Sequence, residues 1–294
     1  MALGVSLAAG PPPWLHAPVA LALIAGGLVL AVVGLCDDRW GAHPLIRLVA
    51  QIGVAVAFVA AGGVLDRLPL PAPLDLPLGP LGPLVVVVWI VAVVNFYNFM
   101  DGIDGLAGLQ AVVTGTALAM AGVDPLLSFL GAALAGAAAS FLLFNWPPAS
   151  IFLGDIGSGV LGWAFATLPF LAIREARGRI MAFVALSLWF FLADASWTLL
   201  RRLARGERLH EAHREHLYQR LVDSGWSHAR VTTVLGLGSV GVTGLALAAL
   251  RLGHNGIWWT SFLVAIVLFG VEVRLVRSRE RRGAGVTDKG GALS

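Results

Sequence analysis

Charged residues are scarce in this chain: they make up 13% of its 294 residues, about half of the roughly 25% that is typical of soluble domains. Hydrophobic residues make up 58%, and the mean hydropathy is +0.84. So few charges cannot cover a soluble core, which excludes a soluble fold and a disordered chain. The single cysteine, Cys36, excludes an internal disulfide scaffold. The composition therefore indicates an integral membrane protein.

Other features are also missing. The segment from Met1 to Trp14 lacks the basic region that opens a secretory signal peptide. No internal repeat is evident, which weighs against the inverted-repeat transporter folds. The pI is near 9.7, yet the net charge is only +3, so the basic residues need no nucleic-acid partner to explain them. In a membrane protein such residues usually report topology.

Long apolar stretches recur along the chain. A bilayer core of about 30 Å needs roughly 20 apolar helical residues for each crossing. The chain offers nine such stretches, near 15–36, 46–64, 82–98, 106–123, 126–144, 158–173, 180–200, 230–250 and 256–275. The Pro-rich segment between the second and third stretches, 68–83, predicts a loop outside the membrane because repeated proline breaks the helical ladder. We expect an all-α, polytopic transmembrane helical bundle of about nine spans.

The basic residues are distributed unevenly between the two ends of these spans. If the loop after the first span is cytoplasmic, fifteen Lys and Arg lie on the cytoplasmic side and five on the other. This three-to-one bias predicts an N-terminus outside and a C-terminus inside. We expect residues 1–277 to form a single transmembrane domain and residues 278–294 a basic, disordered cytoplasmic tail.

Polar side chains gather in four loops on the predicted cytoplasmic face. The ordinary explanation is that such loops are simply polar, but Asn95 to Asp104 holds two Asp and two Asn with no basic residue. Uncompensated carboxylates at a membrane interface are costly, and a divalent cation is the usual compensation. Oxygen ligands of this kind suit Mg²⁺ better than Zn²⁺. Asn95, Asn98, Asp101 and Asp104 recur every three residues, so all four can share one ligand only if the helix unwinds near Gly102.

Four strings in this order resemble one enzyme family. They are LCDDRW from Leu35, NFYNFMDGIDGLAG from Asn95, FNWPPASIFLGDIGSGVLG from Phe144, and RRLARGERLHEAHREHLYQRLVDSGWSHARVT from Arg201. They resemble the motifs of the polyprenyl-phosphate N-acetylhexosamine-1-phosphate transferases (glycosyl transferase family 4), in the form found in bacterial enzymes that initiate O-antigen and surface polysaccharides. Phospho-MurNAc-pentapeptide translocase is related to this family.

The resemblance implies a function. Such an enzyme transfers a sugar 1-phosphate from a UDP-N-acetylhexosamine to undecaprenyl (polyprenyl) phosphate and releases UMP. It implies Mg²⁺ as cofactor, with Mn²⁺ as a substitute, the two substrates and the lipid bilayer as partners, and a location in the bacterial inner membrane with the site on the cytoplasmic face. A homodimer is compatible with it, and no nucleic acid is expected. Both substrates are polyanions, so a cation on the pyrophosphate would cancel charge and stabilise the leaving group.

By this resemblance the acids have distinct roles. Asp155 is expected to be a metal ligand, with Asn98 as a second. Asp37 and Asp38 match the paired catalytic carboxylates; like charges at adjacent positions raise one pKa, so one could act as base while the other helps to hold the ion. Direct attack by the lipid phosphate is favoured, and a covalent aspartyl-phosphate route is the alternative. Each acid has a plainer reading, as a solvated loop residue or a marker of the membrane interface.

The remaining motif residues are expected to bind substrate. Asp104 and Phe152 fit nucleoside recognition by a carboxylate and a stacked ring. Arg47 lies where relatives place a basic residue. General substrate contacts are expected from Asn95, Asp101 and Asn145.

Histidines and arginines dominate the fourth string. His213, Arg214 and His216 match the family's basic loop and suit phosphate binding; a zinc site and a surface that contacts anionic lipid are the alternatives. Asp194 lies inside the seventh span, where lipid would penalise it, and is expected to pair with Arg201 or Arg202.

The chain also departs from the family. Relatives usually begin with two further spans and a cytoplasmic loop and have ten or eleven spans, so a truncated start or an inactive family member is expected. A transporter or flippase for lipid-linked sugars is the rival function, and an inert scaffold a third. Transport needs polar residues near the middle of the membrane, whereas here they crowd at one end of the spans.

Overall fold

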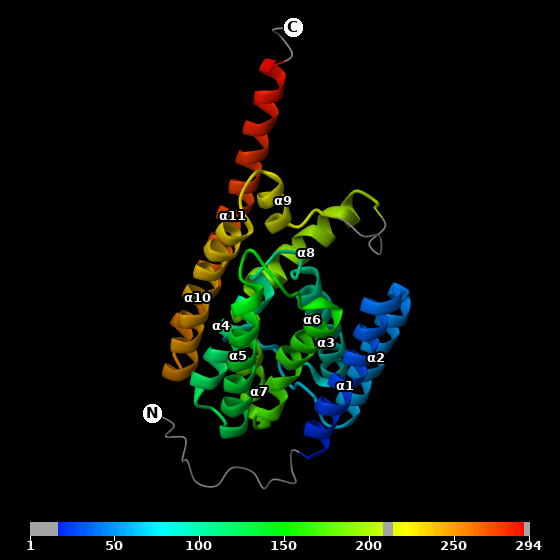
Figure 1. The fold of residues 1–294 in the computed structure, drawn as a ribbon. Coiled ribbons are helices and arrows are strands. Elements are labelled where there is room, and N and C mark those ends of the chain that lie inside the picture. Colours follow the sequence, from blue (N-terminus) through cyan, green and yellow to red (C-terminus); the bar gives the residue numbers. More distant parts are fainter. Residues whose placement is uncertain (1–16, 208–213, 291–294) are drawn as a thin grey trace.

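The described residues, 17–207 and 214–290, form an all-α bundle in a computed structural model (Figure 1). The only extended pairing among them is an isolated bridge between Arg67 and Pro77. The elements in chain order are α1 (Ala17–Trp40), α2 (Pro44–Ala60), η2 (Gly79–Leu81), α3 (Gly82–Phe99), α4 (Leu106–Ala121), α5 (Pro125–Asn145), α6 (Gly154–Thr167), η3 (Leu168–Leu171), α7 (Arg174–Ser187), α8 (Trp189–Ala204), α9 (Leu217–Asp223), α10 (His228–Leu252) and α11 (Asn255–Gly290). The predicted all-α class is confirmed.

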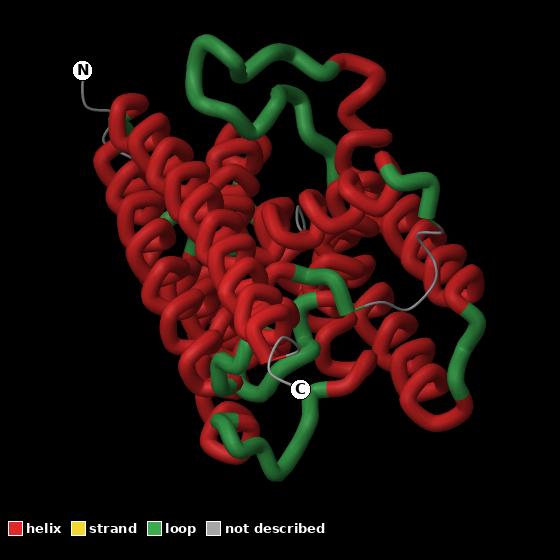
Figure 2. The backbone as a smooth tube through the Cα atoms, turned by 90° about the horizontal axis from the view of Figure 1, so that it is seen from above, coloured by secondary structure: helices red, strands yellow, loops and turns green. Residues whose placement is uncertain are grey.

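The helices begin and end where local chemistry dictates. Gly41 (φ 71°) ends α1, and Pro44 opens α2. Asp124 caps α5 because its Oδ1 accepts the N–H of Leu127 at 3.0 Å. Gly105 (φ 79°) takes the left-handed conformation directly before α4. The chain therefore turns sharply between these helices, which pack into the bundle shown in Figure 2.

Five helices are long and apolar enough to cross a membrane among the residues described: α1, α3 with η2, α5, α10 and most of α11. A sixth crossing results if α7 and α8 together form one bent span. The apolar helices α2 and α4 have 17 and 16 residues, fewer than the roughly 20 of a full crossing. The protein is therefore a multi-pass membrane protein, while the count of nine spans stays a prediction.

The seventh predicted stretch, 180–200, is not one straight helix. It is divided between α7 and α8, which meet at Leu188 with a bend of 73°. Aromatic packing accompanies the bend, since the ring centroid of Phe191 lies 5.0 Å from that of Tyr97 on α3. The last helix also differs from expectation. In place of a disordered tail from residue 278, α11 continues to Gly290, and Glu280 accepts hydrogen bonds of 2.8 and 2.7 Å from Arg220.

The core holds large aromatic side chains, while apolar side chains also cover the outside. Trp163 on α6 packs edge-on against Phe58 on α2, and Phe58 packs in the same way against Phe170. Leu21, Ile24 and Leu28 on α1 are well exposed. An exposed apolar belt of this kind suits lipid tails in place of water.

One helix contact is especially close. The Nε1 of Trp163 donates a hydrogen bond of 2.8 Å to the carbonyl oxygen of Leu23, so α6 is pinned along α1. Near the other end of α1, Gly34 lies against the first turn of α6. A Cβ atom at Gly34 would stand 2.7 Å from the Cα atom of Ile156. The absence of a side chain at Gly34 therefore brings the end of α1 against the start of α6.

Candidate functional site

The acidic motifs meet where α1 ends, α2 begins and α6 begins. Arg47 on α2 bridges two carboxylates: its Nη1 donates to Oδ2 of Asp37 and, at 2.5 Å, to Oδ2 of Asp155. Asp37 also accepts the N–H of Ala42 at 2.7 Å. Residues that lie 118 positions apart in sequence thus share one ion-pair cluster. We call Asp37 and Asp155, which Arg47 joins, the bridged pair.

Asp38 is also turned toward α6. Its two carboxylate oxygens accept the N–H groups of Asp155 at 2.9 Å and of Ile156 at 3.2 Å. These N–H groups belong to the first turn of a helix, which has no internal acceptors for them and attracts negative charge. Asp38 therefore holds the backbone of Asp155 in place, a positioning role that the sequence does not reveal.

Two amides on α3 complete the cluster. Asn98 donates to Oδ1 of Asp155 at 2.6 Å and to Oγ of Ser158 at 2.9 Å. Asn95, one turn earlier, donates to Oε1 of Gln51 at 2.6 Å. Sequence reasoning missed Gln51. The signal was available, because Gln51 is a lone amide four residues after Arg47 and so shares its helix face.

A small cavity lies inside this cluster. Its polar lining is Arg47, Gln51, Asn95, Asn98 and Asp155. Apolar side chains, among them Leu30, Val33 and Val94, complete the wall. The structure thus brings four of the predicted site residues, with Gln51, around one cavity at the ends of the helices.

Asp101 lies in the turn between α3 and α4. The helix ends at Phe99, before Gly102, so the condition under which all four polar residues of this string could share one ligand is met. Burial, together with the nearby carboxylates of Asp155 and Asp38, raises the pKa of Asp101 to about 8. Within the described residues, Arg47 is the only cation that forms an ion pair with Asp37 or Asp155. The repulsion between these carboxylates, which helps to raise the pKa of Asp101, would be relieved by a bound cation.

The residues present fit a hard divalent cation that is shared with a substrate. Among the residues that the structure describes, no three His, Cys, Asp or Glu side chains are grouped to hold a metal by themselves. Mg²⁺ does not require such a cage, because it usually takes one or two carboxylates together with substrate phosphates and water. Asp155 and Asp37 offer those carboxylates, and Asn98 offers a neighbouring amide.

A second cluster surrounds Asp104. Its Oδ2 accepts the N–H of Ala149 at 3.1 Å, and its Oδ1 lies 3.3 Å from Nδ1 of His228. Asn145 is buried and ties the same loops together, because it accepts the N–H of Gly105 at 2.9 Å and donates to the carbonyl oxygen of Ile151 at 2.9 Å. His228 was missed; it opens α10 within the quoted string, two residues after Trp226. Phe152 is 76% exposed, so its ring is available to a ligand.

The basic loop is described only in part. His213 lies outside the described residues, as does His210. Arg214 is exposed and stands 3.7 Å from Asp223. His216 is buried at the start of α9, with Nδ1 3.3 Å from Oδ1 of Asp194. Of this loop, the structure therefore leaves Arg214 open to solvent and holds His216 inside.

The sequence predicted that Asp194 pairs with Arg201 or Arg202, and this prediction is wrong. Its carboxylate accepts the N–H groups of Leu217 at 2.9 Å and of Tyr218 at 3.2 Å, in addition to contacting His216. Arg201 instead pairs with Glu215, and Arg202 with Glu207. The reason is that the free N–H groups at the start of α9 face the buried carboxylate and satisfy it.

α9 in turn contacts the acidic turn. Tyr218 donates its hydroxyl hydrogen to the carbonyl oxygen of Phe99 at 2.9 Å. A Cβ atom at Gly102 would stand only 2.1 Å from that hydroxyl. The fourth motif therefore packs directly against the second, and all four motifs lie at one end of the bundle, which we call the site face.

Gly34→Ala tests the helix contact that brings the bridged pair together. The added methyl group would overlap the backbone of Ile156, so α1 and α6 must move apart. We expect a loss of about 1–3 kcal/mol of stability, seen as a lower thermal midpoint in detergent. Gly53→Ala is the matched control because nothing lies within 4 Å of a Cβ atom there. Equal midpoints for both variants would contradict the close contact.

The fold and the site together define a polytopic membrane protein with an acidic, phosphate-suited site at one end of its helices. A model of glycosyl transferase family 4 matches residues 20–173, more than half of the chain. This chain therefore belongs to glycosyl transferase family 4, and it is a membrane-embedded transferase. The matched region contains Asp37, Asp38, Arg47, Asn98 and Asp155.

Individual relatives agree with this family. The chain is 27% identical to a probable undecaprenyl-phosphate N-acetylglucosaminyl 1-phosphate transferase of Bacillus subtilis over 259 residues, which cover 86% of this chain and 71% of the relative. It is 34% identical to a phospho-N-acetylmuramoyl-pentapeptide-transferase of Synechococcus over 265 residues, 84% and 72% of the two chains. It is 29% identical to a decaprenyl-phosphate N-acetylglucosaminephosphotransferase of Mycobacterium tuberculosis over 279 residues, 85% and 68%.

Proposed function

We propose that this protein transfers a sugar 1-phosphate from a UDP-N-acetylhexosamine to a polyprenyl phosphate, such as undecaprenyl phosphate, and releases UMP. The observation that carries the proposal is the bridged pair, in which Asp37 and Asp155 converge with Asn98 at a cavity on the site face. Two carboxylates that share one arginine at the membrane boundary suit two phosphorylated substrates, one of which is a lipid. The names of the three relatives support the same class of substrates.

The residues suggest how the reaction proceeds. An oxygen of the lipid phosphate attacks the phosphorus atom that carries the sugar; a new P–O bond forms as the P–O bond to UMP breaks. Asp37 takes the proton of the attacking phosphate once Arg47 has passed to a substrate phosphate, whereas Asp38 stays engaged by the N–H groups of α6. Asp155, with Asn98, would hold Mg²⁺ or Mn²⁺, which would supply charge neutralisation on the pyrophosphate. The covalent aspartyl-phosphate route is the alternative.

Other residues would position the substrates. Arg47 can pass from the carboxylates to a substrate phosphate with charge-assisted hydrogen bonds. Phe152 presents an exposed ring for stacking on uracil, and Asp104 lies in the adjoining loop cluster. Arg214, exposed on the basic loop, suits a further phosphate contact. The site face would be cytoplasmic, because the loops there carry most of the basic residues. A bacterial inner membrane and the initiation of a surface polysaccharide fit this arrangement.

The test is release of UMP by the purified protein. We expect UMP when the protein is given Mg²⁺, undecaprenyl phosphate and UDP-N-acetylglucosamine, and none when the lipid phosphate or the cation is left out. A panel of UDP-sugars would identify the donor. Absence of UMP with every donor in the panel would overturn the proposal, and transport of a lipid-linked sugar would then be the function to assay.

Arg47→Gln removes the arginine that joins the two carboxylates of the bridged pair. Without the guanidinium the two carboxylates face each other unpaired, so they should bind a cation more tightly. We expect binding of Mn²⁺ in the absence of substrates to strengthen about tenfold, the effect of ~1.4 kcal/mol. The rate of UMP release should fall by a similar factor, because a phosphate contact is lost. Mn²⁺ titration by electron paramagnetic resonance measures the first effect.

Arg39→Gln is the matched control for this variant. Arg39 is exposed and lies beside Asp38 in the sequence. Its replacement by glutamine removes the same charge as Arg47→Gln. Its Mn²⁺ affinity should equal that of the wild type. Weaker Mn²⁺ binding by Arg47→Gln than by Arg39→Gln would contradict the competition between arginine and cation.

A further inference from the structure

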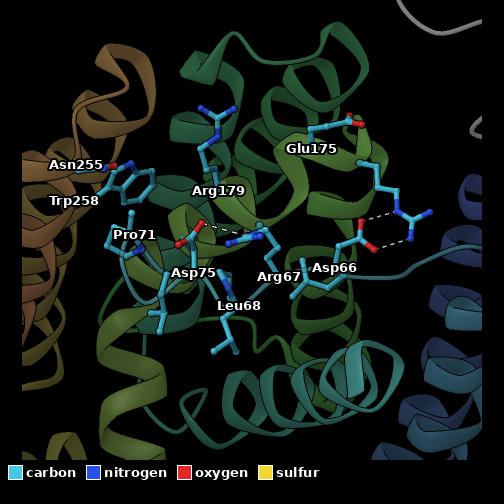
Figure 3. Close-up of a pocket in the computed structure, with 16 residues that line it drawn as sticks. Asp66, Arg67, Leu68, Pro71, Asp75, Glu175, Arg179, Asn255 and Trp258 are labelled. Carbon is cyan, nitrogen blue, oxygen red and sulfur yellow. Dashed lines mark hydrogen bonds and ion pairs between the residues drawn. The ribbon is translucent and has the colours of Figure 1, made fainter. Parts of the chain in front are cut away.

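A separate pocket of about 420 Å³ lies away from the site face, at the other ends of the helices (Figure 3). Three segments line it: residues 65–75, which overlap the beginning of the Pro-rich segment 68–83, the first turns of α7, and the start of α11. The site face is formed where α1 and α3 end, whereas α7 and α11 begin at this pocket. None of the residues that line it belongs to the four motifs.

The pocket is held in shape by specific contacts. Arg174 makes a two-pronged ion pair with Asp66, with both N–O distances 2.6 Å. Arg67, directly before the Pro-rich segment, pairs with Asp75 inside it at 3.2 Å. Trp259 donates from Nε1 to the carbonyl oxygen of Ala72 at 3.2 Å. The Pro-rich segment is thus fastened to both α7 and α11, which keeps the pocket open between them.

One arginine and one glutamate at the pocket are left outside its two ion pairs. Three arginines and three acids line the wall, and the two ion pairs account for four of these six. The other two, Glu175 and Arg179, are four residues apart on α7, a spacing that lets opposite charges pair. They lie apart in Figure 3, and within the described residues neither forms an ion pair. Arg179 is therefore an exposed cation that remains available to a ligand.

The rest of the lining is largely apolar. Leu65, Leu68, Pro69, Ala182 and Trp258 provide this surface. Trp258 and Trp259 sit in the first turn of α11, and tryptophans at the end of a span are typical of the membrane interface. An apolar wall beside an unpaired arginine at this depth matches an amphiphile with an anionic head better than a free anion, which could not use the apolar surface.

We propose that this pocket binds the headgroup of an anionic phospholipid from the leaflet opposite the site face. Arg179 contacts the phosphate, and the glycerol and first methylene groups lie along Leu68 and Trp258. The lipid links the Pro-rich segment, α7 and α11 from the side on which no substrate of the proposed reaction is expected. The proposal is independent of that reaction.

Lipid binding can be measured directly on the full chain in detergent. Phosphatidylglycerol, phosphatidylcholine and inorganic phosphate are added separately, and the thermal midpoint and the lipid retained in native mass spectrometry are recorded. We expect phosphatidylglycerol to raise the midpoint and to be retained, and the other two to do neither. Arg179→Gln should weaken phosphatidylglycerol binding about fivefold, the effect of removing one arginine near a lipid surface. Arg179→Lys should restore it.

A second variant fills the pocket without changing charge. A Cβ atom at Gly178 has its nearest neighbours at 3.9 Å and 4.0 Å, on Pro69 and Leu65, so a leucine fits the backbone and projects into the pocket. Gly178→Leu should abolish retention of the lipid. Gly244→Leu, on α10 with nothing within 4 Å of its Cβ position, and Arg251→Gln, outside the pocket, are the controls and should retain it.

Three results would overturn the proposal. Retention of phosphatidylglycerol by Gly178→Leu at the wild-type level would place the lipid elsewhere. Equal effects of phosphatidylcholine and phosphatidylglycerol would remove the role of Arg179. Stabilisation by inorganic phosphate alone would make the pocket a site for a free anion.

Discussion

Asp155→Asn is expected to lower the rate of UMP release by about 10³-fold, the largest change in activity that the structure predicts, because ~4 kcal/mol of cation-assisted stabilisation would be lost. Within the described residues, Asp155 is the one side chain that forms hydrogen bonds with both Arg47 and Asn98. The amide keeps the size of the carboxylate and removes its charge. Protein folding should change little, since the backbone N–H of Asp155 still donates to Asp38.

Another aspartate, Asp124, provides the control for the loss of one negative charge. Asp124→Asn removes one charge at the start of α5, where asparagine caps a helix as well as aspartate does. It should leave UMP release unchanged. Activity of Asp155→Asn within about tenfold of the wild type, a difference of only ~1.4 kcal/mol, would count against a cation at this position.

Asp194→Ala is expected to cost about 3 kcal/mol of stability, the largest such effect, because it leaves several buried donors without an acceptor. Asp194 is fully buried, and its oxygens accept the N–H groups of Leu217 and Tyr218 and contact His216. Alanine removes every acceptor at once. The thermal midpoint in detergent measures the global effect, and hydrogen exchange at the amides of Leu217 and Tyr218 measures the local one.

Two further variants show whether this loss is specific. Asp194→Asn keeps one carbonyl acceptor and should fall between the wild type and Asp194→Ala. Asp223→Ala removes an exposed carboxylate at the end of α9, the helix whose first N–H groups Asp194 accepts, and should shift the thermal midpoint little. If amide exchange at Leu217 and Tyr218 is unchanged in Asp194→Ala, the carboxylate does not anchor α9.

Much of the site could be predicted from the sequence because its motifs are short and local. The end of α3 before Asp101 follows from the apolar stretch predicted at 82–98, after which polar residues and glycines begin. The meeting of Asp37 with Asp155 could be expected only from the resemblance, since it depends on the contact at Gly34 between two helices distant in sequence. The role of Asp38 as a cap on α6 has no local pattern at all.

Other features depend on packing that one sequence does not encode locally. The bend at Leu188 interrupts a stretch with no proline or glycine, and it accompanies contacts such as that of Phe191 with Tyr97. The pairing of Asp194 was predicted from nearby arginines, whereas the nearest unsatisfied donors belong to a helix more than twenty residues later. His228 meets Asp104 from a still more distant part of the chain.

The contact between α1 and α6 also has a consequence for the order of assembly during biosynthesis. Asp37 leaves the ribosome long before Asp155, and the first turn of α6 provides the N–H groups that Asp38 requires. Until α6 is inserted, the carboxylates at the end of α1 have neither these donors nor their partner across Arg47. A nascent chain that stops at α5 therefore carries the first two acidic motifs without a completed site, and the enzyme becomes competent only when its sixth helix docks.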